Sequence, residues 1–220
     1  MIKLFHDKLL KDESFVFTKF GDGEIICMLN LFKQGDTNCD YQSYSTYLSQ
    51  KLWDSAHHYS NNPKIFIGEW KELFVEHFAS ELKRRNITFQ YCPYESVLHI
   101  KRDDIQDVVS FYKTLKNKDK KIYVCPNRLN QAKEFLNCDI LNVSEREAFS
   151  DYESIKNQLI SSNHKIYMYS CGLMSKVLIH DVLKIRPDTT HIDIGSGLDN
   201  VFYGITRSYQ LEKEEILAMY

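Results

Sequence analysis

The chain has 220 residues, of which 43% are hydrophobic and 26% charged, with 28 basic against 30 acidic side chains. This is the composition of an ordinary globular protein, and a chain of this length has room for one sizeable core but not for two full domains. The formal net charge of -2 excludes a general positive field that would attract nucleic acid. We therefore expect no nucleic-acid partner, and any phosphate binding must be local.

Apolar runs bounded by turn residues predict strands, in chain order, at Phe15–Phe20, Lys64–Gly68, Ile87–Tyr91, Lys121–Cys125, Asp139–Val143, Lys165–Ser170 and Thr190–Ile194. Segments with helical spacing lie between them, at Ile25–Phe32, Tyr41–Tyr59, Lys71–Arg85, Ile105–Lys116, Asn130–Leu136, Tyr152–Ser161 and Ser175–Ile185. This alternation predicts βαβ crossovers, and hence an α/β fold with a doubly wound, mostly parallel sheet and helices on both faces.

We expect a single domain over residues 1–220, in which residues 200–220 form a C-terminal segment that packs across the sheet or against a second subunit. No apolar run approaches the ~20 residues that a membrane span needs, and charges interrupt the start of the chain where a signal peptide needs an apolar stretch. A cytoplasmic location is therefore expected. The six cysteines contain no C-x-x-C pair and lie mostly in apolar segments, which predicts buried free thiols.

The turn K-F-G-D-G-E at residues 19–24 leaves the first predicted strand and enters a helix. Gly21 and Gly23 allow a ligand to approach the backbone closely, and Asp22 and Glu24 lie on a loop from which both carboxylates can face one point. Hard oxygen ligands of this kind suit Mn²⁺ or Mg²⁺, which bridge to substrate phosphates. The same residues fit a plain helix start equally well, with Asp22 as the cap and Glu24 complementing the helix dipole.

Two later strand-to-helix turns also contain glycine. Gly172, which comes after Ser170, would present the N–H groups of the next helix to an anion such as a diphosphate, although an ordinary tight turn explains it as well. The run D-I-G-S-G, with Asp193 and Gly195, resembles part of a dinucleotide or S-adenosylmethionine loop but lacks the third glycine. Arg207 lies beyond this loop and is either a bidentate phosphate ligand or a surface residue.

Four segments, in this order along the chain, resemble the GT-D-type glycosyltransferases, a family linked to adhesin and surface-polysaccharide glycosylation. They are F-G-D-G-E from residue 20, S-E-R-E-A-F-S-D-Y-E-S-I from 144, C-G-L-M-S-K-V-L-I-H-D-V from 171 and H-I-D-I-G-S-G-L-D from 191. The resemblance implies a Rossmann-like domain that binds a nucleotide sugar, typically a UDP-sugar, through a divalent metal at a D-x-E motif. Asp22 and Glu24 match that motif.

The chain departs from the family pattern at several of these turns. Lys19 stands where the family has arginine, Glu147 where it has asparagine, and Gly172-Leu173 where it has a G-P turn. The family's G-H-L-D is lengthened here to G-S-G-L-D, which ends at Asp199. The metal motif is intact, whereas the altered turns would set the donor sugar and the acceptor.

These observations predict a metal-dependent glycosyltransferase that moves a sugar from a nucleoside diphosphate sugar to a glycan or glycolipid-linked acceptor. The residues expected to contact the donor are Lys19, Gly21, Gly23, Ser170, Gly172, Asp193, Gly195 and Arg207. Inversion at the anomeric carbon would need a carboxylate base, for which Asp199 and Glu147 are the first candidates, followed by Glu69 and Glu95. Peripheral membrane association through the acceptor, and a homodimer, are left open.

Two other functions are compatible with the residues. The loop around Gly195 and Gly197 could hold S-adenosylmethionine for a methyltransferase, with Asp193 on the preceding strand, although it comes late in the chain. The protein could also be a non-catalytic subunit that binds a nucleotide or glycan during polysaccharide assembly. The retained D-x-E pair favours an enzyme over such a subunit.

Overall fold

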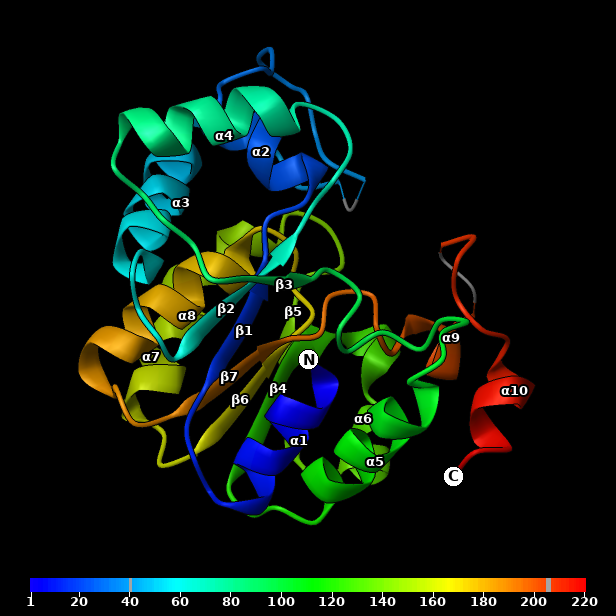
Figure 1. Cartoon of the computed structure of the whole chain (residues 1–220). Coiled ribbons are helices and arrows are strands. Elements are labelled where there is room, and N and C mark those ends of the chain that lie inside the picture. Colours follow the sequence, from blue (N-terminus) through cyan, green and yellow to red (C-terminus); the bar gives the residue numbers. More distant parts are fainter. Residues whose placement is uncertain (40, 205–206) are drawn as a thin grey trace.

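The computed structural model describes residues 1–39, 41–204 and 207–220 (Figure 1). Within these ranges one sheet has the strand order β3-β2-β1-β7-β6-β4-β5, and every neighbouring pair is parallel. The strands are β1 (Val16–Lys19), β2 (Ile65–Glu69), β3 (Tyr91–Pro93), β4 (Lys121–Pro126), β5 (Asp139–Val143), β6 (Ile166–Tyr169) and β7 (Thr190–Asp193). The prediction of an α/β fold with a doubly wound, Rossmann-like parallel sheet is confirmed.

Helices cover both faces of the sheet. Figure 1 shows α3, α7 and α8 on one side and α1, α5 and α6 on the other. The α-helices are α1 (Ile2–Leu10), α2 (Asp22–Met28), α3 (Thr46–Tyr59), α4 (Val75–Arg84), α5 (Ile105–Lys116), α6 (Ala132–Leu136), α7 (Tyr152–Ser161), α8 (Met174–Ile185), α9 (Asp199–Phe202) and α10 (Lys213–Leu217). Two short 3₁₀ helices, η1 (Asn127–Leu129) and η2 (Ala148–Asp151), come after β4 and β5.

Side chains alternate between the two faces along each strand, and this divides the interior into two apolar cores. On β7, Ile192 and Ile194 belong to the core under α1, α5 and α6. His191 and Asp193 therefore point to the opposite face, toward α8. The core on that face is built from α3, α4, α7 and α8 packed on the sheet.

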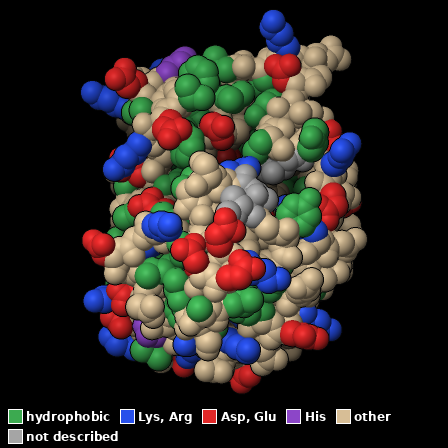
Figure 2. Space-filling model, turned by 90° about the vertical axis from the view of Figure 1, so that its right-hand side faces the viewer, with side chains coloured by type: hydrophobic (Ala, Val, Ile, Leu, Met, Phe, Trp, Pro, Cys, Tyr) green, Lys and Arg blue, Asp and Glu red, His purple; other side chains and the backbone are tan. Residues whose placement is uncertain are grey.

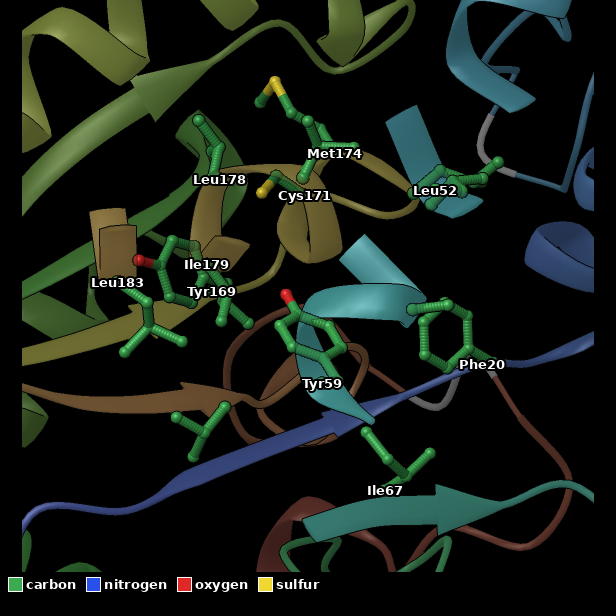
Figure 3. Packing of buried hydrophobic residues seen from close by; sticks show 14 of the residues in the cluster. Phe20, Leu52, Tyr59, Ile67, Tyr169, Cys171, Met174, Leu178, Ile179 and Leu183 are labelled. Carbon is green, nitrogen blue, oxygen red and sulfur yellow. The ribbon is translucent and has the colours of Figure 1, made fainter. Parts of the chain in front are cut away.

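The packing of α3 and α8 fixes the first turn of α8. Figure 3 shows Tyr59, at the end of α3, among buried side chains that include Phe20 and Tyr169. The Tyr59 hydroxyl donates a 2.5 Å hydrogen bond to the carbonyl oxygen of Lys176. The end of α3 is thereby tied to the start of α8, which lies at the carboxyl edge of the sheet.

Several elements begin later than their sequence pattern predicts. Helix α3 starts at Thr46 and not at Tyr41, because Tyr41 has a positive φ of 57° and the Ser45 side chain caps the helix by accepting from the Leu48 N–H at 3.1 Å. Helix α4 starts after Phe74, whose φ is 62°. Strand β3 covers residues 91–93 and not 87–91, because the apolar residues before it are buried in the core without joining the ladder.

Helix α1 was not among the predicted elements. Its residues Ile2, Phe5 and Leu9 are buried, and they have the spacing of one helical face. They complete the core next to α5. At the other end of the chain, Leu211 donates its N–H to the His99 carbonyl oxygen at 3.0 Å, so residues 207–220 pack on the turn after β3.

No helix in the described ranges is long and apolar enough to span a bilayer. All six cysteines are free thiols, as predicted. Five of them are buried, but Cys39 is exposed.

Candidate functional site

The candidate site lies where β1 and β7 are neighbours in the middle of the sheet. From β1 the chain proceeds to β2 and β3 on one side, whereas β6, β4 and β5 lie on the other. The usual ligand sites of doubly wound sheets are crevices at the carboxyl ends of the strands, at the point where the strand order changes direction. The predicted residues that meet at this edge are Lys19, Gly21, Gly23, Glu24, Ser170, Gly172, Asp193 and Gly195.

A buried ion cluster occupies this edge. The Nζ atom of Lys176, in the first turn of α8, lies 2.6 Å from Glu24 Oε1 and 2.9 Å from Asp193 Oδ2. It also donates to the Gly172 carbonyl oxygen at 3.3 Å. Thr18 on β1 donates its hydroxyl to the same Asp193 oxygen at 3.1 Å. A single lysine therefore joins α2, α8, β7 and the Gly172 turn.

The three charged groups of this cluster are buried and stabilise one another's charged forms. Lys176 is 5% exposed, Glu24 7% and Asp193 1%. Burial by itself lowers the pKa of Lys176, but the Asp193 and Glu24 carboxylates outweigh burial and raise it well above its ordinary value. The two carboxylates therefore favour the charged form of Lys176. Asp193 Oδ1 is buried without a hydrogen-bond partner among the described residues, which leaves one acceptor of the cluster open.

The two carboxylates of the D-x-E motif differ in burial, but both lie near Tyr44, whose pKa is raised by burial and then by Asp22 and Glu24. Both residues lie in the first turn of α2, where side chains two positions apart do not share a face. Asp22 is exposed, and its Oδ1 accepts from the Gly23 N–H at 2.8 Å. Glu24 turns inward to Lys176, and its Oε2 accepts from the Gly21 N–H at 3.0 Å.

This arrangement decides how a divalent metal would fit. No group of three or more His, Cys, Asp or Glu side chains in residues 1–39, 41–204 and 207–220 is arranged to hold a metal ion. Mg²⁺ and similar ions, however, are commonly held by one or two carboxylates together with substrate phosphates and water. Asp22 fits such a role, because it is exposed at the site edge, whereas Glu24 already has a partner on each oxygen.

A second buried lysine lies nearby. Lys19 is 4% exposed, donates to the Ile194 carbonyl oxygen at 3.2 Å and lies 5.1 Å from the ring centre of Tyr94. Burial lowers its pKa to about 8, although Asp193 acts in the opposite direction. Gly195 has a φ of 58°, and a Cβ atom there would lie 2.7 Å from Lys19 Nζ. Gly195 is thus needed both for its backbone conformation and for the lysine beside it.

The predicted anion position is the N-terminus of α8. Gly172 has a φ of 58° and turns the chain into the helix. The Leu173 N–H, at the helix start, donates to the side-chain oxygen Oε1 of Gln42 at 3.3 Å. Gln42 comes from the connection between α2 and α3 and is 1% exposed. The predicted phosphate position is therefore in contact with a side chain that the sequence did not single out.

Ser170 and the glycine-rich loop serve mainly to position one another. The Ser170 hydroxyl donates to the Gly195 carbonyl oxygen at 2.5 Å and accepts from the Tyr123 hydroxyl at 2.6 Å. A Cβ atom on Gly197 would lie 3.0 Å from Ile194 and 3.1 Å from Leu98. The loop is closely packed and does not form an open cradle.

The two candidate bases lie in different surroundings. Asp199 begins α9, is 5% exposed, and its Oδ2 is 3.9 Å from Arg128 Nη2. Glu147 is exposed before η2, and it accepts hydrogen bonds from the backbone N–H of Ser43, at 3.1 Å, and from the Ser43 hydroxyl. Glu147 thus joins the α2–α3 connection to the loop after β5.

Arg207 lies at the rim of the site. Its Nη2 donates to the Cys39 sulfur at 3.3 Å, which brings it to the α2–α3 connection. On the face of the molecule shown in Figure 2, basic and acidic side chains are interspersed. Two open surface hollows lie away from this edge, one lined by residues 72 and 74–77 and the other by residues 118–121, 133 and 137–139.

Lys176 and Gln42 are the site residues that the sequence analysis missed. A lysine within the apolar run of α8, K-V-L-I, is a signal of a buried, paired charge that could have been used. No local pattern marks Gln42. Comparisons with known protein families, curated proteins and solved structures find no match for this chain, so its function has to be inferred from the fold and the site geometry.

Proposed function

We propose that this protein is a glycosyltransferase that moves a sugar from a nucleoside diphosphate sugar, such as a UDP-sugar, to a glycan or glycolipid-linked acceptor. The observation that carries the proposal is the set of groups at the β1–β7 junction: two buried lysines, a helix N-terminus and the exposed Asp22. Cations and helix N-termini are the usual partners of phosphate. The ordered resemblance to GT-D-type glycosyltransferases supports the same function.

The chain's own residues would bind and orient the donor. Lys19 and the start of α8 would attract the diphosphate, whereas the charge of Lys176 is balanced by Glu24 and Asp193. Asp22 would hold Mn²⁺ or Mg²⁺ together with the diphosphate, and the metal would stabilise negative charge on the leaving group. Glu24 would act by fixing Lys176.

Inversion at the anomeric carbon would need a carboxylate base for the acceptor hydroxyl. Asp199 is preferred over Glu147, because Asp199 lies beyond the carboxyl end of β7 and is buried beside Arg128. Both oxygens of Glu147 already accept hydrogen bonds from Ser43. A methyltransferase is not favoured, because Gly195 and Gly197 face Lys19, Ile194 and Leu98 at close range.

A thermal-shift screen of nucleoside diphosphate sugars, with and without Mn²⁺, tests this proposal. A true donor should raise the melting temperature in a metal-dependent way, because ligands that bind the folded state stabilise it. Asp22→Asn should weaken the metal-dependent shift without lowering the melting temperature of the free protein, since Asp22 is exposed. The exposed Asp103→Asn variant is the control.

Other outcomes of the same screen would replace the proposal. A shift with S-adenosylmethionine and none with nucleotide sugars would make the protein a methyltransferase. Stoichiometric binding of UDP without hydrolysis or transfer to any acceptor would indicate a non-catalytic subunit. An Asp22→Asn variant that binds Mn²⁺ and UDP as well as the parent would remove the metal from this site.

A further inference from the structure

Gln42 is held in place by bonds within its own segment. Gln42 lies in sequence between Thr37 and Ser43, which form an antiparallel bridge. The Gln42 N–H donates to Asn38 Oδ1 at 2.8 Å, and the Gln42 carbonyl oxygen accepts from the Asn38 N–H at 3.0 Å. With its backbone fixed, the side chain extends inward to the Leu173 N–H at the start of α8.

The carboxamide of Gln42 is satisfied on one side only. Its Oε1 accepts from Leu173 at 3.3 Å, but its Nε2 is buried and has no hydrogen-bond partner among the described residues. A buried donor without an acceptor costs about 1–3 kcal/mol, and few such groups occur in folded proteins. Nε2 shares a carbon atom with Oε1, so the unpaired donor also lies at this helix end.

The helix end itself favours a negative ligand. Helix α8 has 12 residues, long enough for its N-terminus to carry a partial positive charge. Lys176, in its first turn, pairs with Glu24 and Asp193, so its charge is balanced within the protein and the helix end itself supplies the attraction. An anion bound at this helix end would supply the acceptor that Nε2 lacks.

We propose that Gln42 Nε2 donates a hydrogen bond to a phosphate oxygen of the bound ligand, so that Gln42 and the N-terminus of α8 form one phosphate subsite. The identity of the ligand as a nucleoside diphosphate rests on the proposed function. The subsite itself requires only phosphate oxygens. Its neutral donor also matters, because a carboxylate in the same place would compete with the ligand for the helix end.

The Gln42→Glu variant tests this assignment, because it changes the donor into a charged acceptor with almost no change of shape. It keeps an acceptor for the Leu173 N–H, but it buries a carboxylate with one unpaired oxygen, so we expect the melting temperature to fall moderately. Binding is therefore compared at temperatures where both proteins are folded. Affinity for inorganic pyrophosphate and for UDP, measured by titration calorimetry, should fall at least about tenfold. The exposed Gln158→Glu variant on α7 adds the same charge elsewhere and should bind like the parent.

Gln42→Met is the second variant, because it removes both polar groups at similar volume. It should fold with little loss of stability and bind pyrophosphate several-fold more weakly. Unchanged pyrophosphate affinity in a folded Gln42 variant, or a parent protein that binds neither pyrophosphate nor UDP, would overturn the inference. Gln42-dependent pyrophosphate binding without transfer from any nucleotide sugar would leave the subsite standing and refute the glycosyltransferase.

Discussion

Two buried polar side chains on the same face of β7 have different surroundings. His191, in the middle of the strand, is stacked on the rings of Tyr167 and Tyr169, with centroid distances of 4.9 Å and 5.9 Å. Its two ring nitrogens lie 2.9 Å from the Tyr169 hydroxyl and 2.8 Å from the Thr189 hydroxyl. Asp193, at the carboxyl edge, pairs instead with Lys176.

The comparison shows which kind of polar group each part of the sheet accepts. Burial lowers the pKa of His191 to about 3, and Arg186 acts in the same direction, so the mid-strand group is neutral at physiological pH. At the edge, the charges of Lys176, Glu24 and Asp193 persist because they pair with one another. Buried ion pairs add little net stability, so their concentration at one edge fits a ligand site better than a structural device.

The largest loss of stability should come from removing Lys176 from the ion cluster at the carboxyl edge. Lys176→Met leaves Glu24 and Asp193 buried without their cation, and removal of one partner of a buried pair typically costs about 3–5 kcal/mol. The free energy of unfolding, from denaturant titration at pH 7, should fall by that order. Lys184→Met, exposed near the end of the same helix, should change it little. A loss for Lys176→Met no larger than that of the control would contradict the cluster.

Acid should destabilise the protein at the middle of β7, through protonation of His191 in the unfolded chain. The pKa of His191 is about 3 in the folded chain and about 6.5 when unfolded, so below pH 6.5 only the unfolded chain takes up this proton. Stability that is present above pH 6.5 is therefore lost as the pH falls toward 3, by up to about 1.4 kcal/mol per pH unit. His191→Gln removes this proton and should show a shallower decline between pH 6 and 4.

The exposed His77→Gln variant is the matched control for this pH profile. Burial also lowers the pKa of His99 and of His180 to about 4, but both are present in parent and variants alike. The difference between parent and His191→Gln therefore isolates one histidine. If the parent and His191→Gln lost stability in parallel as the pH fell, His191 would be taking up its proton in the folded state as readily as in the unfolded chain.

The smallest expected effect concerns Lys19, the buried lysine of the edge that lies at the end of β1. Lys19 has a pKa of about 8 because it is buried, so its charge opposes folding at pH 7. Between pH 8 and about 10.5 the unfolded chain holds a proton that the folded chain has released, so the parent gains stability as the pH rises from about 8 to about 10.5. Lys19→Met should be more stable than the parent at pH 7 by ~1 kcal/mol, after the lost contacts with Ile194 and Tyr94 are allowed for.

Denaturant titrations of both proteins from pH 7 to 10 measure this difference, which should shrink as the pH rises. The exposed Lys165→Met variant should show no such trend. If Lys19→Met were less stable than the parent at every pH, the lysine would be held by its contacts more strongly than burial opposes it.

The sequence predicted every strand of the described sheet to within a few residues, because strand patterns are local. Differences occur where backbone conformation overrides pattern, as at Tyr41 and Phe74, whose positive φ angles delay α3 and α4. Helix α1 lies outside the predicted elements although Ile2, Phe5 and Leu9 have helical spacing, because a nine-residue segment with three buried positions is a weak periodic signal.

The sequence by itself also placed most candidate residues at the carboxyl ends of strands, since that position results from strand-to-helix order in a parallel sheet. Only the tertiary structure decided how they pair. Strand β7 lies between β1 and β6, and this order brings Lys176 between Glu24 and Asp193 and sets Gln42 on the start of α8. Strand order depends on packing across the whole chain, so no local pattern could show that Glu24 turns inward while Asp22 faces solvent.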